Sequence, residues 1–434
     1  MSAHGSNETG TAGQNRDGAS GDGRDSGSGC DSTPGLMPLE AALAQMLSKV
    51  VPTQKLEKIH VSEALGRVLA EDVVSGIDVP PVDNSAMDGY AFNTKDLALG
   101  KLLPIGLRVP AGAEPGKLAA GTAARIFTGA PVPEGANTVV MQEKCSLDGD
   151  NVMLPEGVPA NDNIRPRGQD IAIGQVVVDK GTRLQGQHMG LLASVGVADV
   201  TVYQKLKVAI FSTGDELVDP GSPVRAGQIY NSNRYTLIGL IQQMGFECVD
   251  LAVVEDTREA TLDVLQRAAS QADCILSTGG VSVGEEDHVK ACVEELGSIG
   301  LWRLAIKPGK PLAFGEVQGA PFIGLPGNPV AAFATCLLCA RPYLLKRQGA
   351  KEVGYESTMV ATGFAKKRGG KRQEYLRVRF ALDEEGKAVL ESYPNQSSGV
   401  LYAVGWATGF AVVPIDATFE KGDLLEYIPF SSLS

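Results

Sequence analysis

Hydrophobic positions recur with two different periods along the chain, and the period changes near residue 205. Short apolar runs predict strands at 207–212, 247–254, 274–277, 301–306 and 321–324. Apolar residues spaced three and four apart predict helices between them, at 234–244, 257–272, 285–296 and 329–346. Strands that alternate with helices form mostly parallel sheets, so this region predicts a central doubly wound α/β domain.

The sequence on either side of this region has a different texture. Helical spacing predicts helices at 36–50 and 187–195, and between them lie short runs such as 124–127 and 138–142, separated by Gly and Pro clusters. Beyond residue 351, short alternating runs predict a small β-domain or barrel. The expected fold is therefore multidomain α/β plus β, divided into a disordered tail 1–35, a discontinuous linker domain 36–75 plus 171–204, an inserted β-rich domain 76–170, the α/β domain 205–347 and the C-terminal β-domain 351–434.

Composition argues against nucleic-acid-binding, membrane and disulfide-rich secreted proteins. The 434 residues carry a formal net charge of −12, which disfavours binding to nucleic acid or to anionic membranes. We find no run of the ~20 apolar residues that a membrane span needs and no secretory leader. Seven cysteines at scattered spacings do not suggest a disulfide framework. We therefore expect a cytoplasmic protein that binds small molecules.

Two loops that follow predicted strands carry acids, at the sheet edge where open α/β sheets bind ligands. The first, STGDE at 212–216, ends in Glu216, and its alternative interpretation is a capped turn with solvated acids. The second, at 277–288, is a glycine-rich loop with Ser282 whose N–H groups suit a phosphate. Its acids oppose phosphate alone, so Asp287 indicates a divalent cation or a proton-transfer role. Its other two acids are better explained by the helix dipole.

Two further loops offer cations and N–H donors. Lys307 and Lys310 lie in a proline-stiffened loop just after Arg303, which predicts an anion site unless they are ordinary solvated lysines. In GLPGNPV at 324–330, Asn328 is a plausible N-cap and Pro329 a first helical residue. The spacing of Cys336 and Cys339 is a weak zinc signal, because both lie in an apolar helix.

Taken together, these motifs resemble the molybdopterin molybdenumtransferase family, the molybdenum insertases related to the gephyrin E domain. The matching segments occur in the family's order and cover residues 37–347, with a looser match beyond. They are DNSAMDGYAF, IFTGAPVPEGA, RPRGQD, STGDEL, GQIYNSN, STGGVSVGEEDH, LAIKPGKP and GLPGNPVAAF. The resemblance implies a transferase that inserts molybdate into adenylylated molybdopterin and releases AMP, with Mg²⁺ assisting. It also implies a homodimer with its site between subunits, and other proteins of molybdenum cofactor biosynthesis as partners.

The resemblance assigns roles to particular residues. The catalytic ones are Asp88, Thr128, Glu216, Asp256 and Asp287, and of these Asp88, Glu216 and Asp287 would also hold the metal. The resemblance also implies substrate-binding roles for Lys307, Pro326, Pro329, Arg372 and Ser398. The loop analysis adds Arg303, Lys310, Ser282 and Asn328 as further candidates for substrate binding. Arg303 stands where the family often has Lys. A carboxylate beside an oxyanion needs a proton or a metal, so we expect raised pKa values among these acids.

Two other functions stay open at this point. The related molybdopterin adenylyltransferase uses the same α/β fold, but it typically has GGTG where this chain has GGVS at 279–282, and it lacks the extra domains. A non-enzymatic scaffold of the gephyrin type would instead bind receptor peptides. The intact motifs favour the molybdenum insertase.

Removal of residues 1–35 should leave both the melting temperature and the rate of AMP release nearly unchanged. The reason is that this polar, glycine-rich segment offers no apolar side chains for a core. Thermal melting and an activity assay on full-length and truncated chains check this. A melting temperature several degrees lower after truncation would show that the segment is docked.

Overall fold

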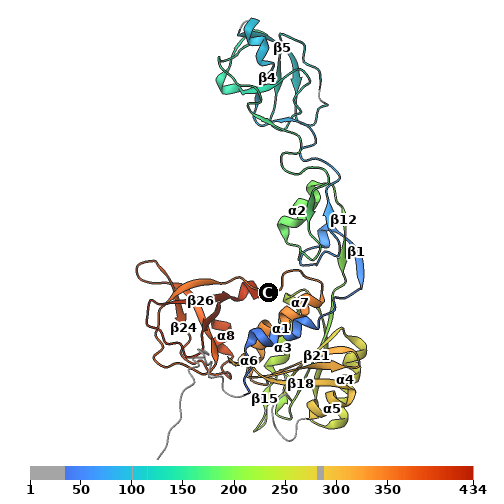
Figure 1. Ribbon diagram of the computed structural model, residues 1–434, viewed down its shortest axis with the longest axis vertical. Helices are drawn as coiled ribbons and strands as arrows, with labels where there is room; N and C mark the ends of the chain where they lie inside the picture. The colour runs from blue at the N-terminus through green and yellow to red at the C-terminus, as the bar shows by residue number, and fades with distance from the viewer. Residues whose placement is uncertain (1–34, 100, 115, 281–287, 434) are drawn as a thin grey trace, which may run out of the picture. The chain divides into compact units, whose positions relative to one another are not determined.

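The computed structural model describes residues 35–99, 101–114, 116–280 and 288–433 (Figure 1). The predictions made for the tail 1–34, for Ser282 and for Asp287 lie outside the described residues.

A six-stranded sheet in the order β16-β13-β17-β21-β20-β18 is the centre of the α/β region. Its strands are β16 (Glu247–Val254), β13 (Lys207–Thr213), β17 (Cys274–Thr278), β21 (Ala320–Leu325), β20 (Pro311–Val317) and β18 (Gly297–Arg303). The first four are parallel, whereas β20 pairs antiparallel with β21 and β18 pairs antiparallel with β20. The predicted mostly parallel sheet is confirmed.

The helices cover both faces of this sheet, as a doubly wound fold requires. In β13, Val208 and Ile210 join one core while Ala209 and Phe211 join the other, because successive side chains of a strand point to opposite faces. The first core includes residues of α1 (Leu39–Ser48), α3 (Ser232–Gln243), α6 (Pro329–Thr335) and α7 (Arg341–Arg347). The second includes residues of α4 (Arg258–Gln271) and α5 (His288–Leu296).

Two predicted elements differ from the structure. The strand expected at 301–306 is split between β18 and β19 (Ile306–Lys307), because the backbone of Met37 bonds to Arg303 and Ala305 at the junction. The helix expected at 329–346 is interrupted by the π-helical segment η4 (Cys336–Ala340). Cys336 and Cys339 lie in the core there, and burial raises the pKa of each thiol to about 12.

Three antiparallel strand pairs carry the chain out of the linker region and back. They are β1 (Leu56–His60) with β12 (Asp199–Tyr203), β2 (Val73–Val74) with β11 (Val176–Val178), and β3 (Asn84–Ser85) with β10 (Ile164–Arg165). Helix α2 (Gly186–Ser194) packs against β11 and the short 3₁₀ helix η1 (Val61–Glu63). Because β3 and β10 are paired, everything between them is inserted.

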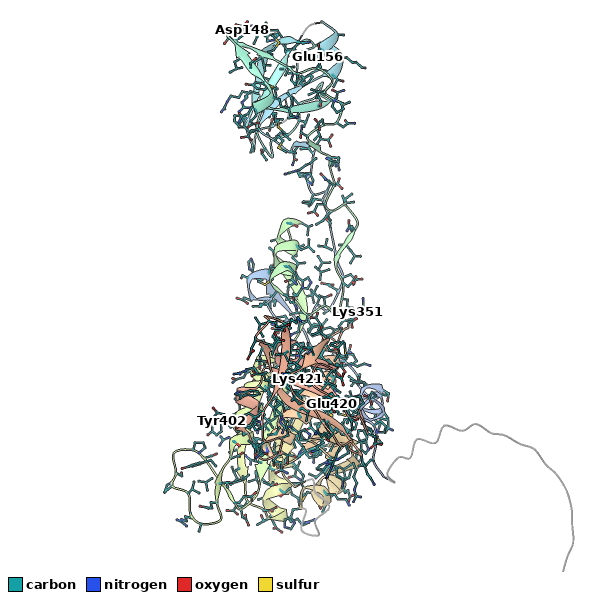
Figure 2. All side chains as sticks on the ribbon, turned by 90° about the vertical axis from the view of Figure 1, so that its left-hand side faces the viewer. Asp148, Glu156, Lys351, Tyr402, Glu420 and Lys421 are labelled. Carbon is teal, nitrogen blue, oxygen red and sulfur yellow. The ribbon has the colours of Figure 1, made fainter. Side chains whose placement is uncertain are left out.

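The inserted segment folds into a curled six-stranded sheet in the order β7-β4-β6-β5-β9-β8 (Figure 2, where Asp148 and Glu156 are labelled in it). Its strands are β4 (Gly89–Phe92), β5 (Leu102–Val109), β6 (Ala123–Ile126), β7 (Thr138–Met141), β8 (Ser146–Asp148) and β9 (Asn151–Met153). This confirms the predicted β-rich insertion.

The C-terminal region forms a closed barrel of five strands. The ring runs β23-β24-β22-β26-β25 and returns to β23, and β19 adds to β23 in parallel. The strands are β22 (Thr358–Thr362), β23 (Gln373–Leu382), β24 (Ala388–Ser392), β25 (Gly409–Val413) and β26 (Leu424–Pro429), with α8 (Tyr402–Trp406) before β25. The predicted barrel is confirmed, while the division into domains at particular residues stays a prediction. None of the helices in the described part of the chain is both long and apolar enough to span a bilayer.

Phe322→Ala should lower the stability of the α/β region by about 3–5 kcal/mol, because Phe322 of β21 is fully buried and its removal leaves a cavity. Leu424→Ala is the control, since Leu424 is 59% exposed and its loss leaves no cavity. Urea denaturation of both variants measures the effect. Equal midpoints for the two would contradict the assignment of Phe322 to the core.

Candidate anion-binding pocket

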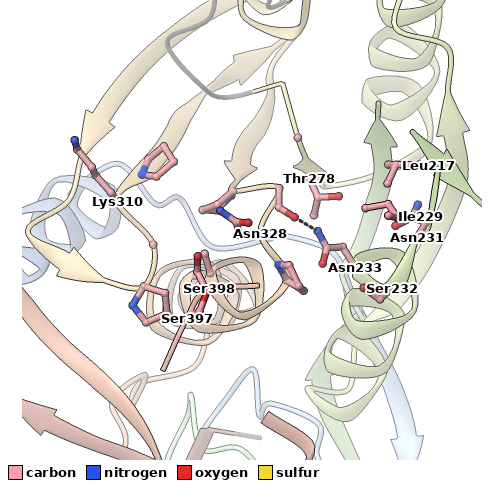
Figure 3. A pocket seen from close by; sticks show the side chains of 18 of the residues that line it. Leu217, Ile229, Asn231, Ser232, Asn233, Thr278, Lys310, Asn328, Ser397 and Ser398 are labelled. Carbon is pink, nitrogen blue, oxygen red and sulfur yellow. Dashed lines mark hydrogen bonds between the residues drawn. The ribbon is translucent and has the colours of Figure 1, made fainter. Parts of the chain in front are cut away.

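A pocket of about 790 Å³ opens at the carboxyl ends of β13, β17 and β21 (Figure 3). Its lining comes from both the α/β region and the barrel, including Thr213, Glu216, Asn231, Asn233, Thr278, Lys307, Lys310, Pro326, Asn328, Pro329, Arg372, Gln396, Ser397 and Ser398. This is the sheet edge at which the loop analysis placed a ligand.

Close backbone packing at the strand ends shapes the pocket floor. Gly279 follows β17 with φ +88°, and a Cβ atom there would meet the carbonyl oxygen of Thr213 at 2.7 Å. The hydroxyl groups of Ser212 and Thr278 are hydrogen-bonded at 2.9 Å across β13 and β17. A side chain at position 279 would therefore push these two strand ends apart.

Positive charge dominates the pocket wall. Among the lining residues that the structure describes, Lys307, Lys310 and Arg372 are cationic and Glu216 is the acid. The guanidinium of Arg372 donates to the carbonyl of Ile306 at 3.2 Å, which fixes it beside the Lys307 loop. In a chain of net charge −12, this local excess of cations suits an anionic ligand.

A buried acid of the barrel reduces the charge of Lys307. The Glu374 carboxylate lies 3.6 Å from the Lys307 ammonium and 2.7 Å from that of Lys366. Glu374 is 8% exposed, so these contacts are weakly screened by solvent. Lys307 is therefore not the free cation that the loop sequence suggested, although one positive charge of the three groups remains uncompensated.

Amide side chains supply further polar groups. Asn231 is 1% exposed; its oxygen accepts from the backbone N–H of Arg234 at 3.1 Å and caps α3, while its Nδ2 has no hydrogen-bond partner within the described residues. Asn233 donates to the carbonyl of Gly327 at 2.8 Å (Figure 3). Asn328 takes the N-cap position of α6 but makes no capping bond with its side chain, which is exposed at the pocket.

The barrel closes one side of the pocket. The backbone N–H of Val330 donates to the carbonyl of Ser398 at 3.0 Å, which fastens the loop before α8 to the start of α6. Ser397 and Ser398 thereby face Asn328 and Lys310 across the pocket (Figure 3).

The pocket brings together eight of the predicted site residues: Glu216, Lys307, Lys310, Pro326, Asn328, Pro329, Arg372 and Ser398. Four others that the structure describes are not in the lining, namely Asp256, Arg303, Asp88 and Thr128. Asp256 is exposed in the loop between β16 and α4, and Arg303 is exposed at the end of the antiparallel edge strand β18.

Asp88 and Thr128 form a separate pair in the inserted domain. The Asp88 Oδ1 atom accepts from the backbone N–H of Thr128 at 2.7 Å and from its hydroxyl at 2.8 Å. These two bonds, the backbone one most strongly, lower the pKa of Asp88 below its ordinary value. The raised pKa expected among these acids is therefore wrong for Asp88.

The described residues do not form a metal site. No group of three or more His, Cys, Asp or Glu side chains within them is close enough together to hold a metal ion. Asp88 and Glu216 belong to different clusters, and the predicted third ligand, Asp287, lies outside the described residues. These residues alone therefore do not fit a resident Mg²⁺.

Several lining residues were not among the predicted site residues. Asn231 directly follows the short strand β15 (Ile229–Tyr230), which pairs with β14 (Leu217–Val218), and Asn233 is in the first turn of α3. Polar residues between a strand and a helix are a signal that could have identified them. Glu374, which lies outside the lining, gave no such signal, because it meets Lys307 through the pairing of β19 with β23.

Comparison with known proteins identifies the class to which this fold and pocket belong. Residues 37–196 match the MoeA N-terminal region (domain I and II), residues 209–346 a probable molybdopterin binding domain, and residues 360–430 the MoeA C-terminal region (domain IV). The crystal structure of the molybdopterin biosynthesis moeA protein from Pyrococcus horikoshii OT3 superposes with a TM-score of 0.78 at 28% identity, covering 91% of this chain and 100% of that one.

Curated relatives make the assignment specific. The chain is 38% identical to the molybdopterin molybdenumtransferase of Haemophilus influenzae, over 92% of this chain and 100% of the relative. It is 34% identical to that of a Nostoc species, over 88% of this chain and 91% of the relative. The chain therefore belongs to the molybdopterin molybdenumtransferase family, among the transferases of molybdenum cofactor biosynthesis. The family membership that its motifs indicated is confirmed.

Glu374→Gln should tighten the binding of molybdate about two- to fivefold at low salt. It removes a negative charge that would repel the dianion. Across the open pocket this repulsion is screened more strongly than the contacts of Glu374 with the two lysines, and it amounts to roughly 0.5–1 kcal/mol. Calorimetric titration with molybdate at two salt concentrations measures the change. Glu391→Gln is the control, because Glu391 pairs with Arg379 on an exposed part of the barrel. The same affinity in both variants would show that Glu374 does not tune the pocket.

Proposed function

We propose that this chain inserts molybdate into adenylylated molybdopterin and releases AMP, as a step of molybdenum cofactor biosynthesis. The observation that carries this proposal is the pocket at the strand ends, where three cations face one carboxylate among the described lining residues. Family membership supports the same reaction, because the relatives named above are molybdopterin molybdenumtransferases.

The residues of the pocket suit the charges of these substrates. The adenylylated pterin carries two phosphates, and molybdate is a dianion. Lys307, Lys310 and Arg372 would hold these oxyanions through charge-assisted hydrogen bonds, and the amide of Asn231 offers an unused donor. In the reaction the phosphoanhydride bond breaks, AMP leaves with an oxygen from water, and the dithiolene sulfurs replace oxygen ligands of molybdenum, which leave as water.

Mg²⁺ would be bound together with the substrate and not as a resident ion of the protein. Mg²⁺ is often bound by one or two carboxylates together with substrate phosphates and water, and Glu216 is the described carboxylate at the pocket. No step is assigned to the ion.

A homodimer is part of the proposal. Asp88 and Thr128 are exposed and lie outside the lining of the pocket, so a second copy of the chain would have to bring them to it. In that arrangement, the ionised Asp88 carboxylate would orient water at the phosphoanhydride. Further proposed partners are the proteins that supply the adenylylated pterin, and the proposed location is the cytoplasm.

The two alternatives are less well supported. An adenylyltransferase would not need the inserted and C-terminal domains, and both of these match regions of the MoeA family. No feature of the described residues favours a scaffold that lacks activity.

AMP release tests the proposal directly. Purified chain is mixed with adenylylated molybdopterin and Mg²⁺, with and without molybdate, and AMP is followed by chromatography. We expect release that depends on molybdate. Formation of adenylylated molybdopterin and pyrophosphate from ATP and free molybdopterin, measured in a parallel reaction, would favour the adenylyltransferase instead.

Lys307→Ala should weaken binding of the adenylylated pterin about tenfold or more, because a charge-assisted contact to a phosphate contributes roughly 1.5–3 kcal/mol. Lys421→Ala is the matched control, since Lys421 is an exposed lysine in the turn before β26 (Figure 2). Calorimetric titration at two salt concentrations measures both variants. Raising the salt should weaken the wild type more than Lys307→Ala. Parallel salt dependences would remove Lys307 from the anion site.

A further inference from the structure

Arg125 lies on β6, three residues before Thr128, close to the Asp88–Thr128 pair. Asp88 precedes β4 and Thr128 lies two residues beyond the end of β6, and the two strands are antiparallel neighbours. Arg125 belongs to β6 and is paired with Tyr90 of β4. Arg125 is therefore one residue from the end of β6, and its pairing partner Tyr90 is two residues from Asp88.

The Arg125 side chain donates hydrogen bonds to Gly89 and Gln142, which both lie next to Asp88. Its Nη1 donates to the carbonyl of Gly89 at 2.9 Å, and its Nη2 donates to the side-chain oxygen of Gln142 at 2.5 Å. The backbone N–H of Gln142 in turn donates to the carbonyl of Asp88 at 3.0 Å. Arg125 thus links Gly89, the residue after Asp88, to Gln142, whose N–H group binds the Asp88 carbonyl.

The surroundings leave Asp88 little freedom to compensate for a loss of these bonds. A Cβ atom on Gly89 would meet the carbonyl oxygen of Val140 at 1.9 Å, so the backbone of β4 lies directly against β7. The Arg125 guanidinium is also stacked on two rings, 5.2 Å from the centre of Tyr90 and 4.7 Å from that of Phe127. These contacts fix the plane of its two donors.

Arg108 is a natural control within the same cluster. It is paired with Arg125 in the sheet, and its guanidinium lies 4.8 Å from the centre of the same Phe127 ring. Arg108 is exposed, whereas Arg125 is half-buried. Within the described residues, the Arg108 side chain makes neither a hydrogen bond nor an ion pair. The two arginines therefore share charge and stacking but differ in hydrogen bonding.

We propose that Arg125 is a positioning residue for the Asp88–Thr128 pair: its two hydrogen bonds hold the backbone around Asp88 so that the carboxylate faces the substrate in one orientation. The inference rests on the proposed function, because it takes Asp88 as a residue of the reaction. The positive charge of Arg125 also helps to lower the pKa of Asp88, after the larger effect of Thr128.

The test compares Arg125→Lys with Arg108→Lys in the full-length chain. Lysine keeps the charge but cannot reproduce the two-pronged hydrogen bonding of arginine. For Arg125→Lys we expect kcat of AMP release to fall about 10- to 100-fold with KM within twofold of the wild type, as for a misplaced reacting group. Arg108→Lys should leave both constants within twofold, and both variants should melt within a few degrees of the wild type.

A second measurement does not depend on activity. Hydrogen–deuterium exchange of the Thr128 amide, which donates to Asp88, should be faster in Arg125→Lys than in the wild type and unchanged in Arg108→Lys. A raised KM with unchanged kcat would make Arg125 a substrate contact and overturn the proposal. Equal effects of the two substitutions, or unchanged Thr128 exchange, would overturn it as well.

Asp88→Asn separates this proposal from the proposed function. Wild-type AMP release in that variant would remove Asp88 from the reaction, whatever Arg125 does. If Asp88→Asn is inactive while Arg125→Lys leaves both kcat and Thr128 exchange unchanged, the proposed function stands and the positioning role of Arg125 is wrong.

Discussion

The close parallel pairing of β13, β17 and β21 is the constraint on which the pocket depends. Their buried residues fasten the sheet to helices on both faces, so the strand ends cannot move independently. The backbones approach so closely at Gly279 that a Cβ atom is excluded. The polar loops after these strands are therefore held at fixed positions, and Lys307, Lys310 and Arg372 face the same pocket from β19, from the loop before β20 and from the residue before β23.

Sequence patterns predicted the architecture because each element is marked locally. The short apolar run of β13 and the helical spacing in α4 are properties of consecutive residues, and they indicate the parallel sheet without knowledge of its partners. The strand expected at 301–306 failed for the opposite reason, since its division depends on bonds from Met37, a residue far away in sequence. The π-helical segment likewise has no local signal in a run of apolar residues.

The difference between local signals and contacts between distant residues also explains which residues of the candidate site could be predicted. Loops after strands identified Glu216, Lys310 and Asn328, because the carboxyl ends of parallel strands meet at one edge. The neutralising contact of Glu374 with Lys307 could not be predicted, since it joins two regions through strand pairing. The resemblance implied a catalytic role for Asp88, but its lowered pKa comes from Thr128, 40 residues away in sequence.

The pairing of β19 with β23 has one further consequence. Lys307 and Glu374 are direct partners in that pairing, so the barrel supplies the counterion of a residue that belongs to the α/β pocket. The electrostatic potential of the pocket is thus a property of two domains in contact, not of either alone. Any change that loosened the barrel would make the pocket more cationic and, through the bond between Val330 and Ser398, would widen it in the same movement. Anion binding in the pocket should therefore depend on the contact between the barrel and the α/β region.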